Sequence, residues 1–191
     1  AAAADSKIVF DGNAQDYHIG LDDSADDLVI GLGSTLGTTS HMVIDEAGVM
    51  STPLQPGFSA IPASDQTNIG HTDTIVFDTE HWDINGDYNT GTSTFTCPVA
   101  GTYLFTLGLR VQSMDSDVSY IQAGLVGAND AWWQIYSGNN LPGDATYTPI
   151  QWSVIVECDA NDAIYTRWNQ SGGTEQMDIS SQSMFCGYKI G

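Results

Sequence analysis

The most informative run of this sequence is Phe95-Thr96-Cys97-Pro98-Val99-Ala100-Gly101-Thr102-Tyr103-Leu104-Phe105. Its two ends are rich in Phe, Thr, Tyr and Leu, and aromatic and β-branched residues of this kind favour strands. The middle of the run holds a proline and a glycine, which favour a turn. The run therefore predicts two short strands joined by a tight connection.

The same alternation of strand and turn continues through residues 58–191. Strand-like runs occupy residues 75–77, 94–97, 101–107, 120–125, 131–136, 150–156, 163–168 and 183–188. Turn-forming clusters lie at residues 85–87, 139–144, 159–162 and 171–173. Short strands at this spacing predict an all-β sandwich or jelly roll.

An ordered series of segments in this part resembles one known family. The series contains Ile75-Val76-Phe77-Asp78, Asn85-Gly86-Asp87-Tyr88, Thr90-Gly91, the run quoted above, Cys158-Asp159-Ala160-Asn161-Asp162-Ala163-Ile164-Tyr165 and Phe185-Cys186-Gly187-Tyr188. In this order the segments resemble the C1q/TNF-like globular domain, with Asn161 where that family usually has glycine. The resemblance implies a ten-stranded jelly roll that assembles as a homotrimer, caps an elongated stalk and binds partners through its outer face and loops.

Residues 1–50 carry a different pattern, with a short internal repeat. Ile8-Val9-Phe10-Asp11, Ile19-Gly20-Leu21-Asp22 and Ile30-Gly31-Leu32-Gly33 recur every 11 residues, and Met42-Val43-Ile44-Asp45 follows one residue out of step. The repeat predicts strands of about four residues joined by tight turns. Because so short a sheet buries little on its own, we expect a trimeric shaft or attachment segment that shares its core with other chains. The alternative is a small β-meander packed on the main domain.

Residues 51–57, Ser-Thr-Pro-Leu-Gln-Pro-Gly, predict a linker between the 1–50 segment and the 58–191 head. The first part lacks the Gly-X-Y period of collagen. It resembles instead the strand-turn segments that precede knobs in phage tail fibres and other virion appendages, on the basis of residues 7–13, 19–23 and 28–31.

The charge balance excludes two classes of partner. The sequence has 24 acidic residues and only 4 basic ones, which gives a net charge of −20. Nucleic acids and anionic membrane surfaces need clustered Lys and Arg, so neither is an expected partner. We also expect no membrane insertion, because no apolar run approaches the roughly 20 residues of a membrane span. No signal segment opens the chain, and without a starting Met we expect a trimmed fragment.

The sequence offers no catalytic residues. Its four histidines lie near no nucleophile motif, and His81-Trp82-Asp83 is assigned to a loop. Cys97, Cys158 and Cys186 lack the spacing of a zinc site. They predict three buried reduced thiols, and one disulfide with one free thiol is the alternative.

Acidic turns make Ca²⁺ the one candidate cofactor. Asp115 and Asp117 present hard oxygen ligands in one turn, and residues 22–27 form a second acidic cluster. Neither matches an EF-hand loop, and a solvated acidic turn is the alternative interpretation of both.

Aromatic residues suggest a ligand-binding surface. Trp132 and Trp133 are adjacent, so in a strand they must point to opposite faces. One can enter the core, while the other faces a neighbouring subunit, solvent or a ligand. Exposed aromatic rings near amides suit carbohydrates. The candidate ligand-binding residues are Trp132, Trp133, Tyr136, Asn139, Asn140 and Tyr147.

These patterns together predict a non-enzymatic, trimeric structural protein of a virion. We expect the tip of a bacteriophage tail fibre or spike, exposed on the particle, with other virion proteins and a host surface glycan or protein as partners. The alternatives are a phage capsid decoration protein or head fibre, a secreted C1q-like lectin and a carbohydrate-active enzyme.

Overall fold

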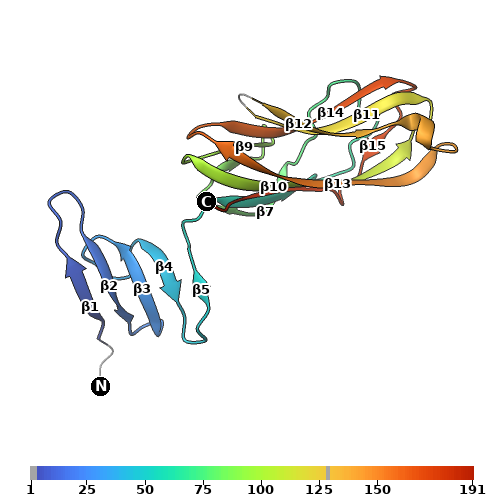
Figure 1. Cartoon of the computed structure of the whole chain (residues 1–191). Coiled ribbons are helices and arrows are strands. Elements are labelled where there is room, and N and C mark those ends of the chain that lie inside the picture. The colour runs from blue at the N-terminus through green and yellow to red at the C-terminus, as the bar shows by residue number, and fades with distance from the viewer. Residues whose placement is uncertain (1–3, 128–129) are drawn as a thin grey trace. The chain divides into compact units, whose positions relative to one another are not determined.

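The computed structural model describes residues 4–127 and 130–191. The chain divides into two compact units, with the boundary between Gln55 and Pro56 (Figure 1). This boundary lies inside the predicted linker. The linker is shorter than predicted, because Ser51 still pairs with Val43 in the first unit and Gly57 already begins a strand of the second.

The first unit is a single antiparallel sheet in which each strand lies beside its neighbour in sequence (Figure 1). Its strands are β1 (Ser6–Phe10), β2 (Tyr17–Asp22), β3 (Asp27–Leu32), β4 (Ser40–Ile44) and β5 (Met50–Ser51). The repeated segments align in register, because Ile8 pairs with Ile19 and Ile19 with Ile30. Sequence repetition thus becomes structural repetition, in strands slightly longer than predicted.

One face of this sheet consists almost entirely of apolar side chains, because strand residues alternate between faces. The register places on it Ile8, Phe10, Tyr17, Ile19, Leu21, Leu28, Ile30, Leu32, Met42 and Ile44. We call this set the N-terminal apolar face. No described part of the first unit covers it: Ile8 is 63% exposed and Phe10 is 60% exposed.

The opposite face of the sheet is covered by the connection between β3 and β4. Leu36 from this connection is buried, and the buried His18 ring contacts the Gly33 carbonyl oxygen through Nδ1 at 2.8 Å. A Cβ atom on Gly20 would lie 2.9 Å from Leu36 Cδ1 and 2.6 Å from Lys7 Cβ. The glycine in the repeat is therefore required for this connection to lie on the sheet.

The second unit is a sandwich of two antiparallel sheets (Figure 1). The β10 sheet has the order β13-β10-β16-β6-β7, with β15 also paired to β10. Its strands are β6 (Gly57–Ile61), β7 (Thr79–Ile84), β10 (Gly101–Met114), β13 (Ala145–Cys158), β15 (Asp178–Ile179) and β16 (Met184–Lys189).

The facing β11 sheet has the order β12-β11-β14-β9-β8. Its strands are β8 (Tyr88–Asn89), β9 (Thr94–Thr96), β11 (Val118–Val126), β12 (Ala131–Tyr136) and β14 (Ala163–Gly172). A 3₁₀ turn, η1 (Gly138–Asn140), follows β12. No helix in the described part of the chain is long and apolar enough to cross a membrane.

The core of the sandwich is built from stacked aromatic rings contributed by both sheets. The Phe58 ring centroid lies 4.6 Å from that of Tyr88 and 4.8 Å from that of Phe95. Tyr103 and Phe105, from the Phe95–Phe105 run, are also fully buried. The prediction of an all-β jelly roll is confirmed.

Two local predictions were wrong. Ile75 and Phe77 are buried but form no strand. The Ile75 N–H donates to Thr166 O and the Phe77 N–H donates to Ser93 Oγ, so the segment forms no continuous ladder with a neighbouring strand. His81-Trp82-Asp83 lies in strand β7 instead of a loop. This edge strand pairs only with β6 and carries polar residues, a composition common at sheet edges and easily mistaken for a loop.

Candidate functional site

The two adjacent tryptophans of β12 lie on opposite faces of the β11 sheet, as their adjacency predicts. Trp132 pairs with Leu125 and packs against the hydrophobic core. Trp133 pairs with Gly124, and its ring lies over that glycine on the outer face. The two residues therefore belong to two different surfaces.

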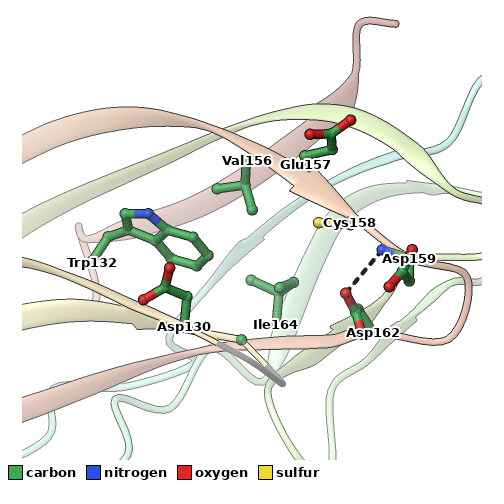
Figure 2. Close-up of a pocket in the computed structure, with 9 residues that line it drawn as sticks. Asp130, Trp132, Val156, Glu157, Cys158, Asp159, Asp162 and Ile164 are labelled. Carbon is green, nitrogen blue, oxygen red and sulfur yellow. Dashed lines mark hydrogen bonds between the residues drawn. The ribbon is translucent and has the colours of Figure 1, made fainter.

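Trp132 lines a pocket of about 330 Å³ between the ends of β12 and β13 and the turn that leads into β14. Figure 2 shows the indole of Trp132 and the side chains of Val156 and Ile164 pointing into a common space. The lining also includes four acidic residues, Asp130, Glu157, Asp159 and Asp162.

Two of these carboxylates support the local backbone. Asp162 accepts a hydrogen bond from the Asp159 N–H at 2.9 Å (Figure 2), and Asp130 accepts one from the Ala131 N–H at 3.1 Å. The described residues of the lining include no Lys or Arg, so the electrostatics of the pocket suit a small organic cation against the indole. Within residues 4–127 and 130–191, no group of three or more His, Cys, Asp or Glu side chains could hold a metal.

The same pocket contains the Cys158 side chain, which interacts with Cys97. Burial is the main cause of a raised pKa for both thiols, and the Cys158 neighbour raises the pKa of Cys97 further. Thiolate is the nucleophilic form of cysteine, so these side chains are poor nucleophiles at neutral pH. All three cysteines are free in the structure, with Cys97 and Cys158 buried and Cys186 half-buried.

The other predicted ligand residues do not converge on this pocket. Tyr136 ends β12, and Asn140 is exposed in η1. Tyr147 lies on β13, where its ring centroid is 4.2 Å from the Arg110 guanidinium carbon. The side chain of Asn139 lies outside what the structure describes. The predicted set is therefore distributed over several surfaces.

Asp115 has a structural role in the turn that was predicted to bind Ca²⁺. Its Oδ1 accepts a hydrogen bond from the Asp117 N–H at 2.7 Å. Its Oδ2 accepts bonds from the Thr174 N–H at 2.5 Å and the Thr174 hydroxyl at 3.1 Å. The buried carboxylate thus ties two loops together, and calcium at Asp115 and Asp117 stays a prediction.

The second acidic cluster also stabilises its own turn. Asp22 Oδ1 accepts hydrogen bonds from the Ser24 N–H at 3.1 Å and the Ser24 hydroxyl at 2.6 Å. The hydroxyl bond is the main cause of a lowered pKa for the Asp22 carboxyl.

Sequence reasoning missed the pocket carboxylates, because Asp130 precedes β12, Glu157 lies in β13, and only the folded sandwich brings these segments together. It did identify Asn161 as a stand-in for glycine. This residue has a φ of 74° in the β13–β14 turn, a left-handed conformation that Asn tolerates better than most residues.

Two solved structures illustrate the similarity of this fold to known ones. The globular domain of zebrafish complement 1qA protein is similar with a TM-score of 0.53 and 14% identity, over 72% of this chain and 98% of that one. Murine APRIL at pH 8.5 is similar with a TM-score of 0.52 and 8% identity, over 71% and 99%. At such identities the likeness concerns the fold alone. A search of the curated proteins finds no match.

The sequence model of the C1q domain matches residues 57–190, which is more than two thirds of the chain. Its first matched residue, Gly57, is also the first residue of β6, and its last follows the end of β16. The match thus covers the whole sandwich. This chain belongs to the C1q domain family.

Proposed function

We propose that this chain is the non-enzymatic, trimeric tip of a bacteriophage tail fibre or spike, which attaches to the host surface through its head. C1q/TNF-like domains are typically trimeric and non-enzymatic, and they bind receptors. The proposal places the protein on the virion, with other virion proteins and a host surface glycan or protein as its partners.

The N-terminal apolar face is the observation that carries the proposal. Its ten apolar side chains form one continuous layer, and exposed layers of this kind mark interaction surfaces. Among the described residues of this unit, the buried hydrophobic side chains are only Val29 and Leu36. Three copies that turn this face toward a common axis would cover it without any other protein.

The head has a second apolar surface, on the outer face of the β10 sheet. Leu104 pairs with Ile155 on one side and with Tyr188 on the other, which places all three on this face. Ile155 is 62% exposed in the single chain. An apolar hollow of about 290 Å³ next to these residues is lined by Phe58, Trp82, Leu104, Thr106, Cys186, Gly187 and Tyr188. Association of heads through this sheet would bury it.

The assignment to a virion is supported by the resemblance of the repeated segments to the strand-turn regions of phage fibres. In the described part of the chain β1 and β5 are the two edge strands of their sheet, and these edges favour a second candidate, a capsid decoration protein or head fibre. Edge strands present unpaired N–H and C=O groups, to which a shell protein could add a strand.

Binding and imaging experiments separate these roles. The purified full chain, labelled with a fluorophore, should bind host cells and compete with virions for attachment. Antibody labelling of virions should mark the end of the tail. Labels over the capsid, with no competition for attachment, would contradict the tail-fibre assignment and favour the decoration protein.

A further inference from the structure

The β11 sheet is free of acidic residues in a strongly acidic chain. None of its described strand residues, in β8, β9, β11, β12 and β14, is Asp or Glu, although the sequence has 24. The β10 sheet differs, since Glu80, Asp83, Glu157 and Asp178 lie in its strands. The outer face of the β11 sheet is therefore a surface on which an anionic group meets no strand carboxylate.

Trp133 forms a flat platform on this face. It pairs with Gly124, and Gly124 pairs with Arg167 on the other side, so the three residues form one row across β12, β11 and β14. A Cβ atom on Gly124 would lie 2.3 Å from Trp133 Cε3 and 2.7 Å from Cδ2. The indole thus lies over the glycine that separates Trp133 from Arg167 in this row.

Arg167 has unused hydrogen-bonding capacity at the end of this row. Its Nη2 donates to the Tyr165 hydroxyl at 3.0 Å, and its guanidinium carbon lies 5.4 Å from the Tyr165 ring centroid. Its Nε is buried without a partner. Arg167 forms no ion pair with any residue in the described ranges, although the chain carries a net charge of −20.

Two amides flank the platform in the next row. Gln122 pairs with Ile135 on β12 and with Asn169 on β14. Asn169 Nδ2 donates to Gln122 Oε1 at 2.8 Å, which fixes both side chains. Asn169 Oδ1 is buried without a partner. This row therefore holds two mutually oriented amide groups next to the row of the indole and the guanidinium.

We infer that this face binds a carboxylate-bearing sugar, with its ring on Trp133 and its carboxylate on Arg167. Aromatic faces accept the apolar C–H side of a sugar ring, and the guanidinium fork matches a carboxylate. Gln122 and Asn169 are placed to bond sugar hydroxyls. The inference rests on the proposed function, because it names the ligand class of a host-binding head.

The unpaired charge of Arg167 favours a carboxylate-bearing sugar over a neutral sugar and over a second copy of this face. A neutral sugar would leave the guanidinium without its counter-charge. A second copy of this face would place one Arg167 near another, and like charges repel. The overall negative charge of the chain favours sugars with isolated carboxylates over densely anionic polymers.

The test is calorimetric titration of the full chain with sialyllactose and with short oligomers of galacturonate, glucuronate and mannuronate. Lactose and the carboxyl-reduced oligomers are the neutral controls. At least one carboxylated sugar should bind, and its neutral counterpart should bind more weakly. Trp133→Ala and Arg167→Gln should each weaken binding by about thirtyfold or more, as expected for residues at the centre of a site.

Arg110→Gln is the matched control, because it removes the same charge from the other sheet, where Arg110 stacks on Tyr147. Arg110 lies on the outer face of the β10 sheet, through which the heads are proposed to associate, so light scattering must first show that the variant keeps the mass of the unmodified chain. Arg110→Gln should leave sugar binding unchanged. Melting curves of each variant report folding, and Trp133→Phe, which keeps an aromatic ring, should retain part of the binding if Trp133→Ala misfolds. Gly124→Ala should also weaken binding, because its Cβ displaces the indole.

Each of these outcomes would overturn the inference: no carboxylated sugar binds, the neutral counterparts bind equally well, or Arg110→Gln reduces binding as much as Arg167→Gln. Self-association that Trp133→Ala abolishes would instead assign the face to a second copy. Light scattering on the same samples separates this inference from the proposed function. A trimer that attaches to host cells but binds none of these sugars overturns the inference alone, whereas a monomer overturns the proposed function.

Discussion

The two units of this chain place their apolar residues in opposite ways. The first unit is one layer, and it leaves a full face of Ile, Leu, Phe and Tyr side chains uncovered. The head is two layers, and it encloses its aromatic residues between them. A single sheet cannot cover its own apolar face, so we expect the first unit to depend on association for its stability. The head has a core of its own.

The largest expected effect concerns that core. Phe58→Ala removes a ring that stacks on Tyr88 and Phe95, and it should reduce the free energy of unfolding of the head by about 3–5 kcal/mol in denaturant titrations. Phe10→Ala is the matched control in the first unit. Because Phe10 is exposed in the single chain, its loss should leave head unfolding unchanged and weaken assembly. A change below about 1 kcal/mol for Phe58→Ala would contradict the core assignment.

The next effect separates the two faces of one strand. Ile8→Asp puts a charge on the N-terminal apolar face, whereas Val9→Asp puts the same charge on the opposite face of β1. Burying an unpaired carboxylate in an assembly costs several kcal/mol, so Ile8→Asp should dissociate the oligomer in sedimentation experiments. Val9→Asp should remain assembled. If both variants stay assembled, the apolar face is not the contact.

A smaller effect compares acidic turns of the two units. Burial, with Asp83 as a second cause, raises the pKa of the Asp87 carboxyl in the head, whereas hydrogen bonds from Ser24 lower that of Asp22 in the first unit. A carboxyl whose pKa is raised by folding destabilises the protein above that pKa. The penalty is relieved as pH falls through the folded pKa, and it is gone below the unfolded value.

Asp87→Asn should therefore raise the melting temperature at pH 7, and the gain should vanish at acid pH. Asp22→Asn should lower the melting temperature at pH 7, and this loss should vanish at acid pH. The stabilisation from the lowered pKa of Asp22 is present above its pKa in the unfolded chain, and it is lost as pH falls through its pKa in the folded protein. Melting curves of both variants, recorded from pH 7 down to acid pH, test the direction of each change in melting temperature. A lower melting temperature for Asp87→Asn at neutral pH would show that its carboxylate is stabilising.

The smallest expected effect concerns the rate at which the buried cysteines are alkylated. Because burial raises the pKa of the Cys97 and Cys158 thiols, iodoacetamide should modify them in the native protein far more slowly than in denaturant. The test is peptide mass analysis after timed alkylation at pH 8. Rapid modification of Cys158 would show that the pocket beside Trp132 opens in solution.

Much of the fold could be predicted from the sequence, because alternation in runs such as residues 101–107 reports directly which side chains are buried. The predictions failed where the backbone bonds to side chains, as at Phe77, and at the polar edge strand β7. The candidate sites were harder to predict from the sequence. Gly124, Trp133 and Arg167 become neighbours only through the register of three strands, and register is a property of the folded sheet.

The absolute mass of the full chain in solution tests the central claim most directly. Multi-angle light scattering at micromolar concentration should give three times the chain mass of 20.4 kDa, because the N-terminal apolar face and the outer face of the β10 sheet are then both covered. A mass of one chain, at concentrations where the protein remains soluble and folded, would contradict the account.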